Sequence, residues 1–227
     1  MVSNAVNQPA VPDEGAGIHV QYVLLARRLS QFLIHARQRP ARTLEVTLAG
    51  ASAELPKSTL AHAALAELLA PMLDAPVNAV NAAVLAAERG VEVSEATSAG
   101  PTLHGIDYTG LVRLSIVDGT GARTSVAGTL AADGTPRLVD RNGRRIDAQL
   151  EGRILVLQNA DTPGVIGRVG TLLGEAGVNV SRMQMGRDRP GGSAVSLWAL
   201  DGAPPASLLS RLSAIDQADS ATVAVLV

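Results

Sequence analysis

The residues best suited to bind a ligand lie in a short turn between a predicted strand and a predicted helix. Asn159 and Asp161 bring a side-chain amide and a carboxylate to this turn, and Gly164 precedes an apolar pattern with helical spacing. The unpaired N–H groups and the partial positive charge at a helix N-terminus attract a carboxylate. Asp161 offers the opposite charge to an ammonium group, and Asn159 can hold a polar side chain. The turn therefore predicts a site for a small amino acid.

Helix capping is the alternative that the local sequence leaves open for these residues. Asp161 or Thr162 can serve as the N-cap, with Pro163 near the first helical position. Gly164 is either a hinge that permits close packing or simply a residue of the first helical turn. Capping and ligand contact can also coexist at Asn159 and Asp161.

Arginines form a second candidate site on a predicted hairpin, with Arg113 and Arg123 preceding it in the chain. A phosphate or carboxylate site needs such donors to converge. A solvated basic surface is the alternative. The hairpin arginines are Arg137, Arg141, Arg144 and Arg145.

Catalytic, metal and nucleotide motifs cannot be placed on this chain. The histidines are far apart, without metal-ligand spacing or the context of a catalytic triad. Residues 15–17 follow no strand and residues 119–121 join two strands, so neither glycine pair fits a dinucleotide loop. We therefore expect no catalytic residue, no metal and no cofactor, NAD included. The four histidines are His19, His35, His62 and His104.

The elements that hold the first site form a predicted βαββαβ unit over residues 151–227. Gly177 is expected to end its first helix, and residues 187–192 read as a hairpin loop between two strands. This order is that of a ferredoxin-like domain. Apolar runs predict its strands at 153–158, 178–185, 193–200 and 221–227, with helices after Pro163 and after Pro205.

A larger α+β domain with a mostly antiparallel sheet is predicted over residues 18–150. Residues 22–37 form its first helix, and residues 1–17 are expected to be a disordered tail because they are polar and rich in Pro, Gly and Ala. Two further helices are predicted from 56 or 58 to about 69 and over 78–89. The predicted strands are 43–48, 91–97, 111–117, 124–130 and 137–139.

Composition excludes several classes of function. The chain has no cysteine, so disulfides, thiolate zinc sites and cysteine-ligated iron–sulfur clusters are excluded. A formal charge of -2, with one Trp, two Tyr and one Phe, argues against nucleic acid as a partner. No apolar run is long enough to span a membrane, and the first residues lack a signal-peptide pattern, so we expect a soluble, cytoplasmic protein.

Two motifs carry a resemblance to known families. Asp161-Thr162-Pro163-Gly164, followed by Gly177-Val178-Asn179-Val180, resembles the signature of an ACT domain, the amino-acid-sensing module of biosynthetic enzymes. The wider run, through residues 77–82, 125–130 and 167–174, is similar to the C-terminal half of long-form D-3-phosphoglycerate dehydrogenase. In that family an allosteric substrate-binding domain precedes the ACT domain, and here the catalytic and nucleotide-binding domains are missing.

The resemblance implies roles for particular residues. It assigns ligand contact to Asn159, Asp161 and Gly164, and it implies that Asn179 reaches the ligand from the neighbouring subunit. It also places Arg137 and Arg144 where relatives carry basic residues for an anionic effector. Gln149 stands at a further position that is basic in some relatives. We therefore expect an amino-acid site that two subunits share, and an anion site that lacks one of its basic side chains.

Three hypotheses of function result. The first is a regulatory module that binds L-serine, by resemblance to feedback inhibition of serine biosynthesis. The second is a ligand-free oligomerisation module, in which the strand 178–185 pairs with its copy to give a homodimer. The third, an independent enzyme, needs a nucleotide loop, a substrate arginine and a His–Glu pair that cannot be placed here. The sequence leaves open a fragment, a split subunit beside a separate catalytic dehydrogenase, and a stand-alone sensor.

Overall fold

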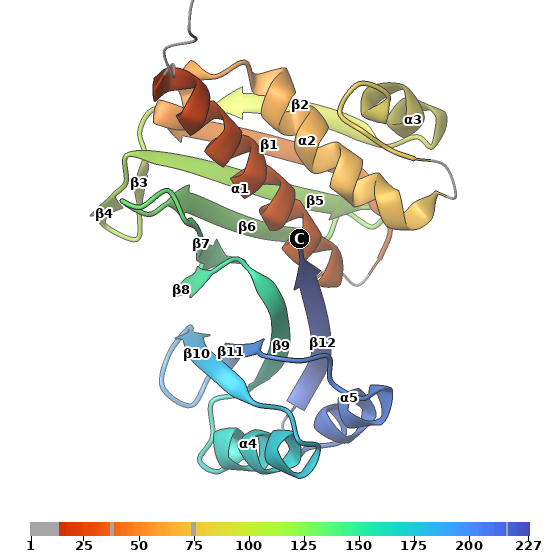
Figure 1. Ribbon diagram of the computed structural model, residues 1–227, viewed down its shortest axis with the longest axis vertical. Helices are drawn as coiled ribbons and strands as arrows, with labels where there is room; N and C mark the ends of the chain where they lie inside the picture. The colour runs from red at the N-terminus through yellow and green to blue at the C-terminus, as the bar shows by residue number, and fades with distance from the viewer. Residues whose placement is uncertain (1–13, 37–38, 74–75, 217) are drawn as a thin grey trace, which may run out of the picture.

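Two helix-covered sheets make up the chain in the computed structural model, which describes residues 14–36, 39–73, 76–216 and 218–227 (Figure 1). The larger sheet has six strands, of which β1 and β2 are parallel and the other neighbours antiparallel. This confirms the predicted α+β class. The strand order is β2 (Glu92–Thr97), β1 (Ala41–Gly50), β5 (Gly110–Asp118), β6 (Arg123–Leu130), β7 (Pro136–Arg141) and β8 (Arg144–Gln149).

Helices cover one face of the larger sheet. Leu25, Leu29 and Phe32 recur at helical spacing and are fully buried against it. Gly128 of β6 permits this approach, because a Cβ there would lie 2.9 Å from Leu25, 3.0 Å from Leu29 and 2.7 Å from the carbonyl of Arg137. The helices are α1 (Glu14–Ala36), α2 (Lys57–Leu69) and α3 (Ala82–Glu88), with 3-10 turns at Ala51–Glu54 and Ala70–Met72.

One prediction for this domain needs correction, and one short hairpin was not predicted. Residues 14–17 belong to the first turns of α1 rather than to a disordered tail, so the helix begins eight residues before its predicted start at Tyr22. The remaining tail, residues 1–13, lies outside the described residues. The short hairpin of β3 (Thr102–Leu103) and β4 (Ile106–Asp107) was not predicted, because two-residue strands have no readable periodicity.

The smaller sheet confirms the predicted ferredoxin-like order. Its strands lie in the order β10 (Val180–Arg187), β11 (Ser193–Leu200), β9 (Gly152–Ala160) and β12 (Ala218–Leu226). The helices α4 (Val165–Glu175) and α5 (Ala206–Ser213) cover the face that points away from the larger sheet (Figure 1). Leu155, Leu157 and Trp198 pack against these helices.

The opposite face of the smaller sheet joins the core of the first domain. Because side chains alternate along a strand, Ile154 and Val156 of β9 point away from α4 and α5. Together with Leu197 they belong to the same buried cluster as the inner face of α1. Arg28 of α1 also donates to the carbonyl of Leu150, at 2.9 Å. The two predicted domains therefore share one continuous core.

No helix within the described residues is long and apolar enough to cross a membrane.

Candidate functional site

The predicted amino-acid site lies where β9 ends and α4 begins. Asn159 and Asp161 stand at the carboxyl end of β9, which pairs with β11 through Ser193 and Ala160. This register brings the loop between β10 and β11 beside the turn. Accordingly, the N–H of Asp161 donates to the carbonyl of Gly192 at 2.7 Å. The turn and the hairpin loop therefore form one structural unit.

The Asp161 carboxylate is held by that hairpin loop. Its Oδ2 accepts a hydrogen bond from the Arg187 guanidinium at 2.9 Å and one from the N–H of Gly191 at 3.3 Å. The Arg187 contact, followed by that of Gly191, keeps the pKa of the Asp161 carboxyl below its ordinary value. The carboxylate is thus ionised near neutral pH, as an ammonium partner requires.

Asp161 does not cap α4, which corrects one of the sequence-based alternatives. The N-cap is Gly164, without a side-chain cap hydrogen bond, and the helix begins only at Val165. The cause is the backbone: Gly164 has φ 92°, a left-handed conformation that glycine adopts without the strain of a Cβ. The carboxylate of Asp161 is therefore available for other contacts than helix capping. The predicted stop at Gly177 is confirmed, since α4 ends at Glu175.

Asn159 lies beneath the turn and is only 4% exposed. It follows Leu155 and Leu157 on the face that α4 and α5 cover. Its Nδ2 donates to the carbonyl of Ala160 at 2.7 Å. That contact uses one of the two Nδ2 hydrogens, so the amide keeps one donor and its oxygen, and its burial places Asn159 under the turn.

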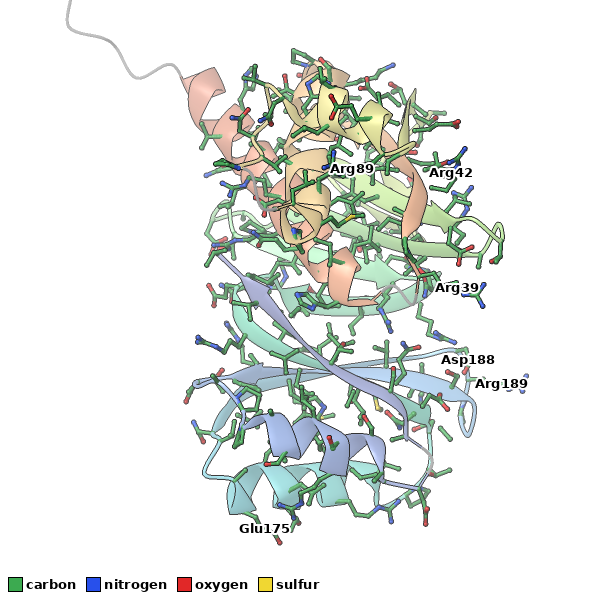
Figure 2. All side chains as sticks on the ribbon, turned by 90° about the vertical axis from the view of Figure 1, so that its right-hand side faces the viewer. Arg39, Arg42, Arg89, Glu175, Asp188 and Arg189 are labelled. Carbon is green, nitrogen blue, oxygen red and sulfur yellow. The ribbon has the colours of Figure 1, made fainter. Side chains whose placement is uncertain are left out.

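Asn179 lies at the other end of the same unit. It precedes β10, and it pairs with Asp201 through its side-chain amide and its backbone carbonyl. One protomer therefore does not bring Asn179 to Asp161. In Figure 2, Asp188 and Arg189 of the hairpin loop and Glu175, the last residue of α4, lie toward opposite sides of the smaller domain.

The two arginines of the predicted anion site are also apart. Across the β7–β8 hairpin, Arg137 pairs with Gln149 while Arg144 pairs with Arg141 at the turn. The separation along the strand is about 13 Å at roughly 3.3 Å per residue. The two arginines therefore do not stand next to each other on the hairpin, and anion binding stays a prediction.

The surroundings of the hairpin arginines differ from one another. Arg137 pairs with Asp147 at 2.6 Å and lines a small interdomain space of about 60 Å³ with Gln149 and Arg182. Arg141 is 1% exposed, and burial, followed by the nearby charge of Arg144, lowers its pKa to about 10. The hairpin is therefore not the uniform solvated surface that the sequence offered as an alternative.

Sequence reasoning missed the contacts of Arg187 and Gly191 with Asp161 at the candidate site. The signal was available in the topology, because a ferredoxin-like order pairs β11 with β9 and so places residues 187–192 beside the turn. Within the described ranges, no three His, Asp or Glu side chains gather as metal ligands.

Comparison with known protein families agrees with this architecture. The model of the D-3-phosphoglycerate dehydrogenase intervening domain matches residues 19–142, more than half of the chain, and the ACT domain model matches residues 153–217. The chain belongs to the D-3-phosphoglycerate dehydrogenase family. Its turn at Asn159 and Asp161 lies in the part matched by the ACT domain model, whereas the intervening-domain match ends at residue 142, inside the arginine hairpin, with Arg144 just beyond it.

Curated relatives named D-3-phosphoglycerate dehydrogenase are considerably longer. The Bacillus subtilis protein is 34% identical over 203 residues, which cover 88% of this chain and 37% of the relative. The Methanocaldococcus jannaschii protein is 28% identical over 215 residues, covering 95% of this chain and 40% of the relative. The chain thus spans about two-fifths of the relatives that it matches, and the matched part is the intervening domain with the ACT domain.

Proposed function

We propose that this chain is an amino-acid-sensing regulatory module of D-3-phosphoglycerate dehydrogenase, with L-serine as its ligand. The observation that carries the proposal is the Asp161 carboxylate, which is ionised, does not cap α4 and stands beside the helix N-terminus. The names of the relatives support serine biosynthesis as the setting. Catalysis is assigned to polypeptide outside the matched domains, whether joined to this module or a separate subunit.

The proposed ligand site is completed by a second copy of the chain. β10 is an edge strand, and β8 approaches its face near Gly186 rather than its outer edge. If the two-fold axis passes through the middle of β10, antiparallel pairing with its copy sets Val180 of one chain opposite Arg187 of the other. Asn179 of the partner subunit then lies beside Asp161. The separation of Asn179 from Asp161 within one chain is therefore what a shared site requires.

An exposed apolar side chain on α4 supports the same arrangement, since Ile166 is 45% exposed. A hollow of about 430 Å³ lies on another side of the helix, lined by Gly164, Gly167, Arg168, Thr171 and Leu172 and by Ile215 after α5. At 100° per residue Ile166 lies opposite Gly164 and Thr171, so this hollow is not the surface that a second α4 would cover.

Calorimetric titration with L-serine tests the proposal. A hydrogen bond to a charged group contributes about 1.5–3 kcal/mol, so Asp161→Asn should weaken binding roughly tenfold or more. Asp188→Asn is the matched control, because Asp188 lies on the neighbouring loop and contacts its own loop rather than Asp161. We expect the control to bind like the unaltered protein.

The ligand-free alternative gives a different outcome. If the module only holds subunits together, L-serine will not bind, although sedimentation will still show a dimer. A monomer at micromolar concentration would contradict both the shared site and the oligomerisation hypothesis. Turnover of 3-phosphoglycerate with NAD by this chain alone would contradict the assignment of catalysis to other polypeptide.

A further inference from the structure

Arg187 is a positive charge held directly at the candidate site. It ends β10, its side chain is 50% exposed, and one guanidinium nitrogen lies 2.9 Å from Oδ2 of Asp161. A guanidinium carries five N–H donors in a planar fork that matches a carboxylate. The contact with Asp161 uses one terminal nitrogen, so the group keeps donors for a second acceptor.

The Asp161 carboxylate likewise has lone pairs that accept no hydrogen bond among the described contacts. Both of its hydrogen bonds among the described contacts, from Arg187 and from Gly191, fall on Oδ2. A carboxylate offers about four lone-pair sites on its two oxygens, so Oδ1 can accept a new donor without displacing Arg187. The ion pair therefore presents one negative and one positive group side by side, with unused capacity on each.

We propose that Asp161 and Arg187 form a two-point clamp for an α-amino acid, in which Asp161 holds the ammonium group and Arg187 holds the carboxylate. Both ligand charges are attached to one carbon atom, so a complementary site must place its opposite charges next to each other. The inference rests on the proposed function and adds a requirement: the ligand must carry a free α-carboxylate.

The alternative role for Arg187 is to compete with the ligand's ammonium group for the Asp161 carboxylate. In that case it occupies the place of the ligand ammonium, and its removal would strengthen binding. The helix N-terminus offers a third possibility, because it could attract the ligand carboxylate without any help from Arg187. A ligand pair that differs only at the carboxylate separates these possibilities.

The experiment titrates the dimer with L-serine and with L-serinamide, which keeps the ammonium group and the hydroxyl but lacks the carboxylate. Arg187→Gln removes the proposed contact, and Arg187→Lys keeps the charge without the fork. Arg189→Gln is the matched control, since Arg189 lies two residues away at the exposed tip of the loop (Figure 2). Thermal melts of each variant check that it is folded.

We expect the unaltered protein and Arg189→Gln to prefer serine over serinamide by roughly tenfold or more. Arg187→Gln should lose that preference and bind serine roughly tenfold more weakly, while Arg187→Lys should keep part of the preference. Serine binding that is unchanged or tighter in Arg187→Gln, with the preference intact, would overturn the clamp while leaving the serine site standing. Absence of serine binding in the unaltered protein would overturn the proposed function as well.

Discussion

Truncation of Leu197 tests whether the two domains share one core. Leu197 of β11 is 2% exposed and belongs to the cluster that also contains Leu25 of α1. Leu197→Ala removes three carbon atoms from this cluster, beside an interdomain space of about 60 Å³ that it already lines. Leucine truncations in well-packed cores cost about 2.7–5 kcal/mol, and an existing space indicates limited collapse around the site. We therefore expect a loss of about 3 kcal/mol or more.

Calorimetric or circular-dichroism melts measure this loss. For a chain of this size 1 kcal/mol corresponds to roughly 2–4 °C, so the melting temperature should fall by about 6–12 °C. The whole chain should still melt in one transition, because both sheets lose the same core. Val84→Ala is the matched control: Val84 is 62% exposed on α3, and its truncation should change stability by less than about 0.5 kcal/mol.

Two results would refute the shared core. One is a change below about 1 kcal/mol for Leu197→Ala, which would mean that the smaller sheet does not pack on the larger one as described. The other is a pair of separate transitions in the unaltered protein, of which only one responds to the substitution. Either result would also remove the shared core as a physical route by which the proposed ligand binding could affect the intervening domain.

Two further predictions concern the turn between β9 and α4. Gly164→Ala places a Cβ on a residue with φ 92° and should destabilise the chain by about 1–2 kcal/mol in urea titrations. Gly167→Ala, which places its Cβ in open space inside α4, should stabilise the chain by about 0.5–1 kcal/mol. Equal effects of the two substitutions would contradict the left-handed conformation of the N-cap. The pKa of Asp161 is lowered on folding, so its contribution to stability is complete above the unfolded value of about 3.9 and is lost as the pH falls through the lower folded value. Serine affinity should therefore stay constant from pH 7 to pH 5, and a decrease within that range would contradict an ionised Asp161.

Sequence reasoning predicted the elements well where apolar periodicity was long. The run at residues 153–158 and the helical spacing after Pro163 correspond to β9 and α4, and the hairpin loop lies between β10 and β11 as expected. The cap of α4 was predicted wrongly, because Asp and Thr are common N-caps and the left-handed conformation of Gly164 cannot be seen in the residue types.

The candidate site was predicted only in its local part. Asn159 and Asp161 are close in sequence, so their placement follows from one strand and one turn. Arg187 reaches Asp161 only through the pairing of β11 with β9, which is a tertiary contact between residues 26 positions apart. The separation of Arg137 from Arg144 likewise depends on the register of the β7–β8 hairpin, since both positions looked clustered along the chain.

Amide NMR of the isotopically labelled chain, titrated with L-serine, tests the central claim most directly. Glycine amides report on the site from several sides, because Gly164 lies at the start of α4 while Gly191 and Gly192 contact Asp161. We predict saturable shifts concentrated at these glycines and at Asn159, with Gly119 and Gly134 of the intervening domain unaffected. Unchanged spectra at saturating serine, or shifts centred away from the turn, would contradict an amino-acid site at the start of α4.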